Sequence, residues 1–75
     1  MKELVEFVAK SIVNEPDAVE VTEENDERGL VLKLTVADDD KGRVIGKQGR
    51  IAGAMRTLLR VKAAKQGIKV TLEIV

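Results

Sequence analysis

Residues 44–51 read VIGKQGRI, and this stretch decides how the chain is organised. Gly46 and Gly49 stand three positions apart, so the backbone can turn sharply and approach a ligand without a Cβ in the way. The turn separates a short helix predicted to end near Ile45 from a longer helix predicted over residues 50–65. Because the second glycine opens that helix, unpaired backbone N–H groups and the positive end of the helix dipole face the turn. The pattern indicates an anion-binding turn suited to phosphate oxygens.

Cationic side chains surround this turn. Lys47 lies inside it, and Arg43 and Arg50 flank it. Side chains of this kind hold a phosphodiester backbone in register, while the backbone N–H groups donate to its oxygens. An alternative is that Gly46 and Gly49 merely permit a tight corner between two helices. The clustering of three cations on the corner favours a binding role.

Apolar spacing predicts the elements on either side of the turn. A helix over residues 2–14 has three- and four-residue spacing, and Pro16 ends it. Alternation predicts strands over residues 18–22, 30–36 and 68–74, with a charged turn over residues 23–29. The inward side chains expected of the two long helices are Leu4, Val5, Phe7, Val8, Ile12, Val13, Ile51, Met55, Leu58 and Leu59.

These elements predict one α+β domain over residues 1–75, in the order helix-strand-strand-helix-helix-strand. Each strand is apolar on one side, so we expect a three-stranded sheet covered by helices on a single face. Asp38, Asp39 and Asp40 are expected to cap the short helix that precedes the glycine turn.

The net charge of zero conceals a strong asymmetry. Residues 1–40 carry four basic and twelve acidic side chains, whereas residues 41–75 carry nine basic and one acidic. Segregation on this scale suggests that the second half presents a cationic surface to an anionic partner. The alternative is that the two halves attract each other within the fold. Arg56 and Arg60 are four apart on one helix face. They could extend the contact with the anionic partner, but they are interpreted mainly as solvated or as paired with acidic side chains.

Composition argues against an enzyme. The chain has no cysteine and no histidine, and its single serine, Ser11, has no histidine to activate it. Residues 42–47 come near a nucleotide-binding Walker loop, but the glycines are too close and Gln48 replaces the Mg²⁺-binding Ser or Thr. Contiguous aspartates at 38–40 lack the spacing of a calcium loop. We expect no metal, no cofactor, no membrane span and a cytoplasmic protein.

The stretch at 44–51 resembles the signature of the KH family: an aliphatic pair, GxxG with basic or polar central residues, and an isoleucine two positions after the second glycine. The helix-first order is similar to the type II KH arrangement. The size resembles that of the small stand-alone bacterial KH proteins of the KhpA type. The resemblance implies a protein that clamps single-stranded RNA, as an RNA chaperone or post-transcriptional regulator. The implied contact residues are Arg43, Val44, Gly46, Lys47, Gln48, Gly49 and Arg50.

The resemblance also implies a base-binding groove between the helix-turn-helix and the last strand, with aliphatic walls that include Val44 and the strand from Ile68. Family members of this type imply two kinds of partner, a second copy in a homodimer or a larger Jag-type RNA-binding protein in a heterodimer. Val61 on the long helix is a candidate contact. The competing hypothesis is a protein-interaction module that keeps the KH shape and has lost RNA binding.

Overall fold

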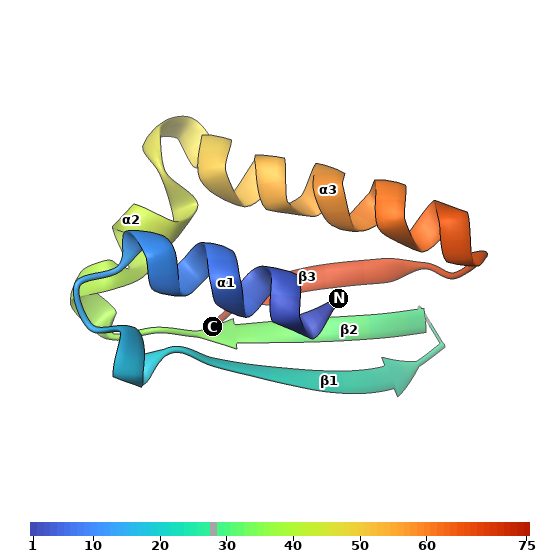
Figure 1. Cartoon of the computed structure of the whole chain (residues 1–75), viewed down its shortest axis with the longest axis horizontal. Coiled ribbons are helices and arrows are strands. Elements are labelled where there is room, and N and C mark those ends of the chain that lie inside the picture. Colours follow the sequence, from blue (N-terminus) through green and yellow to red (C-terminus); the bar gives the residue numbers. More distant parts are fainter. Residues whose placement is uncertain (28) are drawn as a thin grey trace.

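The computed structural model describes residues 1–27 and 29–75 and confirms the predicted order of elements (Figure 1). Three single 3₁₀ turns join the longer elements, at Pro16–Ala18, Asp38–Asp40 and Lys47–Gly49. The helices and strands are α1 (Lys2–Ile12), β1 (Glu20–Asp26), β2 (Gly29–Thr35), α2 (Lys41–Ile45), α3 (Arg50–Gln66) and β3 (Val70–Ile74).

The three strands form one mixed sheet in the order β1-β2-β3. β1 and β2 are antiparallel neighbours, whereas β2 and β3 run parallel because α2 and α3 form the crossover between them. The register places Leu34 opposite Val21 and Leu32 opposite Leu72, so the apolar face is continuous across the strands. The helices pack on this face. The buried core consists of Val5, Ala9, Val21, Leu32, Leu34, Val36, Val44, Met55, Leu59 and Leu72.

The first strand differs from its prediction. β1 runs from Glu20 to Asp26, and Glu23 pairs with Leu32, so the strand predicted over residues 18–22 starts and ends too early. The turn predicted over 23–29 is too long, although Glu27 does lie in a turn. Residue 28, which the predicted turn included, lies outside the described residues. Only Val21 of β1 is buried. Because polar side chains fill the rest of this edge strand, the sequence carries no alternation there to reveal it.

The inward side of α1 is mostly as predicted, since Leu4, Val8, Ile12 and Val13 are partly buried against the core. Val5 and Ala9, four residues apart, are fully buried. Phe7 is 72% exposed, so its assignment to the inward face is wrong. Two positions correspond to roughly 200° around an α-helix, which places Phe7 opposite Val5.

The buried face of α3 consists of Ala52, Met55, Leu59 and Ala63. Met55 and Leu59 were predicted, but Leu58 is 52% exposed and that prediction is wrong. Leu58 and Leu59 are adjacent and therefore about 100° apart on the helix, so only one can point to the sheet. At 17 residues α3 is the longest helix, and within residues 1–27 and 29–75 no helix is long and apolar enough to cross a membrane.

Asp40 performs a different task from the capping role predicted for it. Its side chain is 1% exposed, and no side-chain capping bond forms at the start of α2. The two carboxylate oxygens instead accept the backbone N–H groups of Asn14 and Glu15, each at 3.1 Å. Asp40 therefore fastens the segment that leaves α1 to the start of α2, the helix that leads into the glycine turn. Asp38 is exposed and pairs with Lys41 at 3.4 Å.

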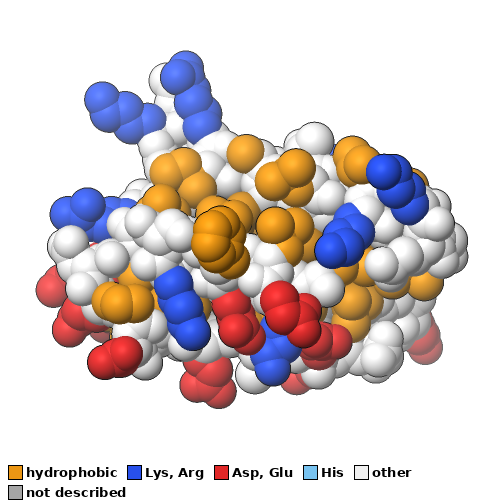
Figure 2. Space-filling model, in the orientation of Figure 1, with side chains coloured by type: hydrophobic (Ala, Val, Ile, Leu, Met, Phe, Trp, Pro, Cys, Tyr) orange, Lys and Arg blue, Asp and Glu red, His pale blue; other side chains and the backbone are white. Residues whose placement is uncertain are grey.

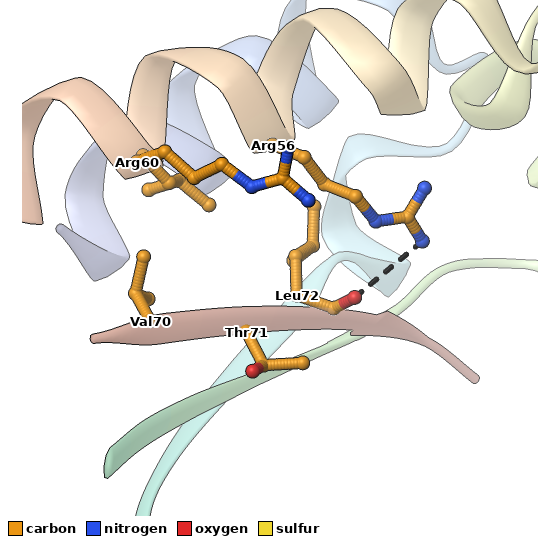
Figure 3. A pocket seen from close by; sticks show the side chains of 6 residues that line it. Arg56, Arg60, Val70, Thr71 and Leu72 are labelled. Carbon is orange, nitrogen blue, oxygen red and sulfur yellow. Dashed lines mark hydrogen bonds between the residues drawn. The ribbon is translucent and has the colours of Figure 1, made fainter. Parts of the chain in front are cut away.

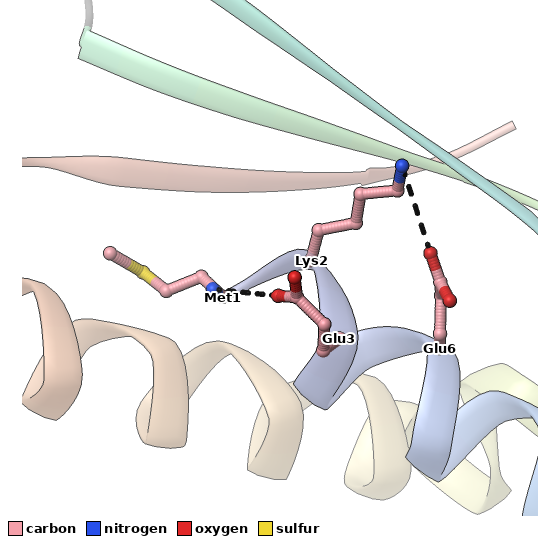
Figure 4. A network of polar contacts seen from close by, with 4 residues as sticks. All are labelled: Met1, Lys2, Glu3 and Glu6. Carbon is pink, nitrogen blue, oxygen red and sulfur yellow. Dashed lines mark hydrogen bonds and ion pairs between the residues drawn. The ribbon is translucent and has the colours of Figure 1, made fainter.

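Short polar contacts hold the start of α1 (Figure 4). The amino group of Met1 lies 3.4 Å from the carboxylate of Glu3, and Lys2 pairs with Glu6 at 3.9 Å. A hydrogen bond from the backbone N–H of Glu3, with the terminal ammonium beside it, holds the pKa of the Glu3 carboxyl below its ordinary value. An acidic side chain in the first turn also complements the helix dipole.

Candidate nucleic-acid interface

The turn at Gly46–Gly49 depends on three residues with positive φ. Gly46 has φ 75°, Gln48 φ 57° and Gly49 φ 72°. The N–H of Gly46 donates to Gly42 at 2.9 Å and closes α2, and the N–H of Gly49 donates to Gly46 at 3.2 Å. Three residues with positive φ within four positions reverse the chain between two helices without a long connection.

The two glycines are required for different reasons. A Cβ on Gly46 would lie 2.8 Å from Cγ1 of Ile51 and 3.0 Å from its backbone nitrogen, so the turn folds back onto the first residues of α3. A Cβ on Gly49 would meet nothing within 4 Å, and only its φ of 72° favours glycine there. The Ile51 of the sequence pattern is therefore the residue against which Gly46 packs.

The N-terminal end of α3 faces the turn without a side-chain cap. Gly49 occupies the capping position and makes no side-chain capping bond, although the N–H of Arg50 donates to the Lys47 carbonyl. Lys47 and Gln48 are exposed. The Arg50 guanidinium reaches back to the Gln48 side-chain oxygen at 3.5 Å. Uncapped N–H groups, the helix dipole and two cations thus gather at one end of α3.

Arg43 and Val44 lie differently from the rest of the predicted contact set. Nε of Arg43 lies 3.5 Å from Oδ1 of Asp40, with the Arg43 side chain 54% exposed. Val44 is fully buried in the core, so its prediction as a groove wall is wrong. Helix geometry turns Val44 toward the sheet, and its neighbour Ile45, 40% exposed, is the aliphatic side chain on the surface.

A cleft lies between α3 and β3 (Figure 3), where a groove beside the last strand was predicted. Its narrower part has a volume of about 140 Å³, and an adjoining part measures about 300 Å³. The aliphatic side chains of Leu59, Val70 and Leu72 line the narrower part, with Arg56 and Arg60 on the helix side. Ile68 lines the adjoining part, as predicted for the last strand.

Arg56 and Arg60 line this cleft, although the favoured interpretation of the sequence was a solvated or ion-paired helix face. Both extend from α3 toward β3, and Arg56 donates to the carbonyl oxygen of Leu72 at 3.4 Å (Figure 3). Their four-residue spacing places them on one helix face, which was visible in the sequence. This helix face borders an edge strand because of how α3 packs on the sheet. The sequence pattern does not reveal that packing.

The charge asymmetry of the sequence becomes an asymmetry of the surface. Lys and Arg side chains project from the glycine-turn end of α3, whereas acidic side chains gather over α1 and β1 (Figure 2). Apart from Arg43 with Asp40 and Lys41 with Asp38, the described ion pairs stay within the first half of the sequence. Over the described ranges, seven cations of the second half form no ion pair with a carboxylate, four of which lie at the turn or the cleft; the seven are Lys47, Arg50, Arg56, Arg60, Lys62, Lys65 and Lys69. Internal neutralisation therefore does not account for their placement.

Comparison with known proteins agrees with this geometry. Residues 2–74 match a family model described as KhpA/KhpB, KH domain. The RNA-binding protein KhpA of Clostridium perfringens is 51% identical over 75 residues, and that of Clostridium acetobutylicum is 49% identical, each covering all of both chains. A relative of the same name from Aquifex aeolicus is 47% identical over 74 residues, which is 99% of this chain and 94% of its own length. No solved structure matches the chain.

The family match extends over nearly the whole chain and does not depend on the glycine turn alone. It confirms the KH resemblance and the helix-first order, and the family is a non-enzymatic one. The chain belongs to the KhpA/KhpB family of KH-domain proteins.

Proposed function

We propose that this chain binds single-stranded RNA and holds the phosphates of about four nucleotides on the turn at Gly46–Gly49. The observation that carries the proposal is the uncapped N-terminal end of α3, with Lys47 exposed within the turn and Arg50 directly after it. Relatives about half identical to this chain are named RNA-binding proteins, which supports the same ligand here.

Arg43 would add a further phosphate contact. Its Nε is engaged by Asp40, which leaves the remaining guanidinium N–H groups for an anion. Three or four phosphate contacts correspond to a log–log salt slope of roughly −2 to −3 for a single strand. We expect modest affinity, because so few charges contribute.

The bases would lie in the α3–β3 cleft, against the partly exposed Val70 and Ile68, because Leu59 and Leu72 at its base are almost fully buried. Many single-strand binders stack bases on aromatic rings, but the only aromatic residue in this chain, Phe7, is on α1. Aliphatic walls contact bases without stacking them, so most positions of the RNA would be read weakly. This fits a role as an RNA chaperone or post-transcriptional regulator.

We also propose that the chain associates with a second copy or with a larger Jag-type RNA-binding protein. Leu58 and Val61 are 52% and 53% exposed, and together with Ala54 they form an apolar stripe along α3. By helical geometry this stripe points away from Arg56 and Arg60, so a partner on it would leave the cleft open. Two linked sites would raise avidity without new RNA contacts. Sedimentation equilibrium of the native chain and of Val61→Glu tests this, and a monomer for both contradicts self-association.

The RNA proposal is tested by fluorescence anisotropy with a short labelled single-stranded RNA at two salt concentrations. The variant carries Lys47→Asp and Gln48→Asp, which reverse the charge of the turn and keep both glycines. Aspartate tolerates the left-handed conformation at position 48. We expect this variant to lose binding while its circular dichroism stays native.

The chain supplies a matched control, since residues 65–67 repeat the sequence Lys-Gln-Gly at the other end of α3. Lys65→Asp with Gln66→Asp makes the same change of charge outside the turn and outside the cleft lining. It should retain most of the native affinity. Equal loss in both variants would mean that overall charge, rather than the turn, governs binding. Absence of binding by the native chain would favour the protein-interaction alternative.

A further inference from the structure

The free edge of β3 offers unpaired backbone groups to the cleft. The Lys69 carbonyl accepts from Leu30 at 3.0 Å, and the Val75 N–H donates to Leu34 at 2.8 Å, so the odd-numbered residues face β2. Peptide groups alternate in direction along a strand, and those of Val70 and Leu72 therefore face outward. β3 is at the edge of the sheet, and no other strand of the described residues pairs with its outer side.

Arg56 covers one of these outward carbonyls. Its Nη2 lies 3.4 Å from the Leu72 oxygen, at the long end of the hydrogen-bonding range, and the bond is part-buried (Figure 3). A guanidinium has five donors and no acceptor, so most of the hydrogen-bonding capacity of Arg56 is left for a ligand. A long bond is also readily exchanged for a shorter one. Arg60 brings a second donor-only group to the same cleft, whereas the Thr71 side chain points away from α3 (Figure 3).

The chemistry of this position selects among bases. Guanine presents two adjacent acceptors, O6 and N7, which match the fork of an arginine, whereas adenine places an amino donor beside N7. If Arg56 turns from the strand to a base, the Leu72 carbonyl needs a new donor. Guanine also carries an N2 amino group that can donate to it. Adenine would instead set its amino group against two guanidinium groups that cannot accept.

We propose that Arg56 is a specificity-determining residue that exchanges the Leu72 carbonyl for the O6 and N7 atoms of one guanine. The proposal rests on the single-stranded RNA binding proposed above and adds a base preference to it. One base position is read in this way, while the aliphatic remainder of the cleft accepts any base.

The test compares two labelled nonamer RNAs, (UUG)3 and (UUA)3, by anisotropy. Any register of a four-nucleotide clamp then includes a purine. The native chain should bind (UUG)3 about tenfold more tightly, as one bidentate arginine–guanine contact provides. Replacing guanine with 7-deazaguanine, which lacks N7, should remove most of that preference.

Three variants isolate the side chain. Arg56→Met keeps the apolar stem and removes the donors, so the two RNAs should bind within about twofold of each other. Arg56→Gln should shift the preference toward (UUA)3, because glutamine pairs bidentately with adenine. Lys62→Met removes a charge from another face of α3 and should preserve the tenfold ratio. Melting by circular dichroism establishes that each variant is folded.

Two results would overturn only the base preference assigned to Arg56. One is a guanine preference that persists in Arg56→Met. The other is equal binding of both RNAs by the native chain, while Lys47→Asp with Gln48→Asp still abolishes binding. That outcome would support the phosphate clamp and refute only the proposed recognition of guanine. Failure of the native chain to bind either RNA would overturn the clamp as well.

Discussion

Replacing Asp40 with alanine is expected to destabilise this chain more than any change to a neighbouring aspartate. The substitution removes a buried carboxylate that accepts two backbone N–H groups at 3.1 Å. Hydrogen bonds to charged groups contribute about 1.5–3 kcal/mol each. The two donors are only part-buried and can recover water, and the pair with exposed Arg43 adds little, so we expect a loss of about 2–4 kcal/mol.

A loss of that size is a large share of the total. Domains are stable by about 0.05–0.15 kcal/mol per residue, which for 75 residues is roughly 4–11 kcal/mol. Each kcal/mol shifts the melting temperature of a domain this small by about 4–8 °C, so Asp40→Ala should melt roughly 10–25 °C lower. Asp40→Asn keeps the volume but sets an amino donor against one of the two N–H groups, and we expect a substantial part of the same loss.

Urea unfolding followed by circular dichroism measures the difference directly. Asp38→Ala is the matched control, because Asp38 is exposed and pairs only with Lys41, and it should change the free energy of unfolding by less than about 0.5 kcal/mol. If Asp40→Ala proves as mild as Asp38→Ala, the carboxylate does not fasten the exit of α1 to the start of α2. The placement of the glycine turn would then need another explanation.

Other substitutions test the turn and the faces of α3. Gly46→Ala should cost about 1–3 kcal/mol in urea unfolding, because its Cβ would lie 2.8 Å from a side-chain carbon and φ is positive, whereas Gly53→Ala, with open space inside a helix, should gain about 0.5–1 kcal/mol. A gain for both would contradict the close packing of the turn. Gln48→Ile should lower stability by about 1–2 kcal/mol in thermal melts, because a β-branched residue disfavours the positive φ at position 48, whereas Gln48→Asn should be nearly neutral. Equal stability of the two variants would contradict the left-handed conformation at this position. Leu59→Ala should cost about 2–5 kcal/mol and Leu58→Ala less than about 1 kcal/mol at dilute concentration, and equal losses would refute the assigned faces of α3.

The fold and the glycine turn could be predicted because several local signals agree there. The glycine spacing, the cations and the isoleucine at 51 all lie within a few residues, and the strand at 30–36 alternates clearly. The order of elements then follows from a short list of ways to cover a three-stranded sheet. The resemblance to KH proteins rests on the same residues.

The errors arise where packing, rather than local pattern, decides. Phe7 and Leu58 are apolar at positions near a buried face, and the sequence does not distinguish them from inward residues. Val44 was predicted to contact a ligand because it lies next to the glycine turn, yet its side chain packs in the core against the sheet. Asp40 was expected to cap its own helix, but its carboxylate contacts a segment about 25 residues earlier in the chain, a partner that no local rule identifies.

The parallel pairing of β2 with β3 also bears on when the binding surface exists during synthesis. β1 and β2 are close in sequence and form a hairpin. The third strand joins the sheet only when Leu30 pairs with Val70, which lies far along the chain. Closing such a long loop is entropically costly and favours late docking of β3. Because β3 forms one wall of the cleft and α3 the other, a ribosome-bound chain that has already made the glycine turn would still lack the cleft. The turn could bind a phosphate before β3 leaves the ribosome, but a base could bind in the cleft only after β3 has joined the sheet.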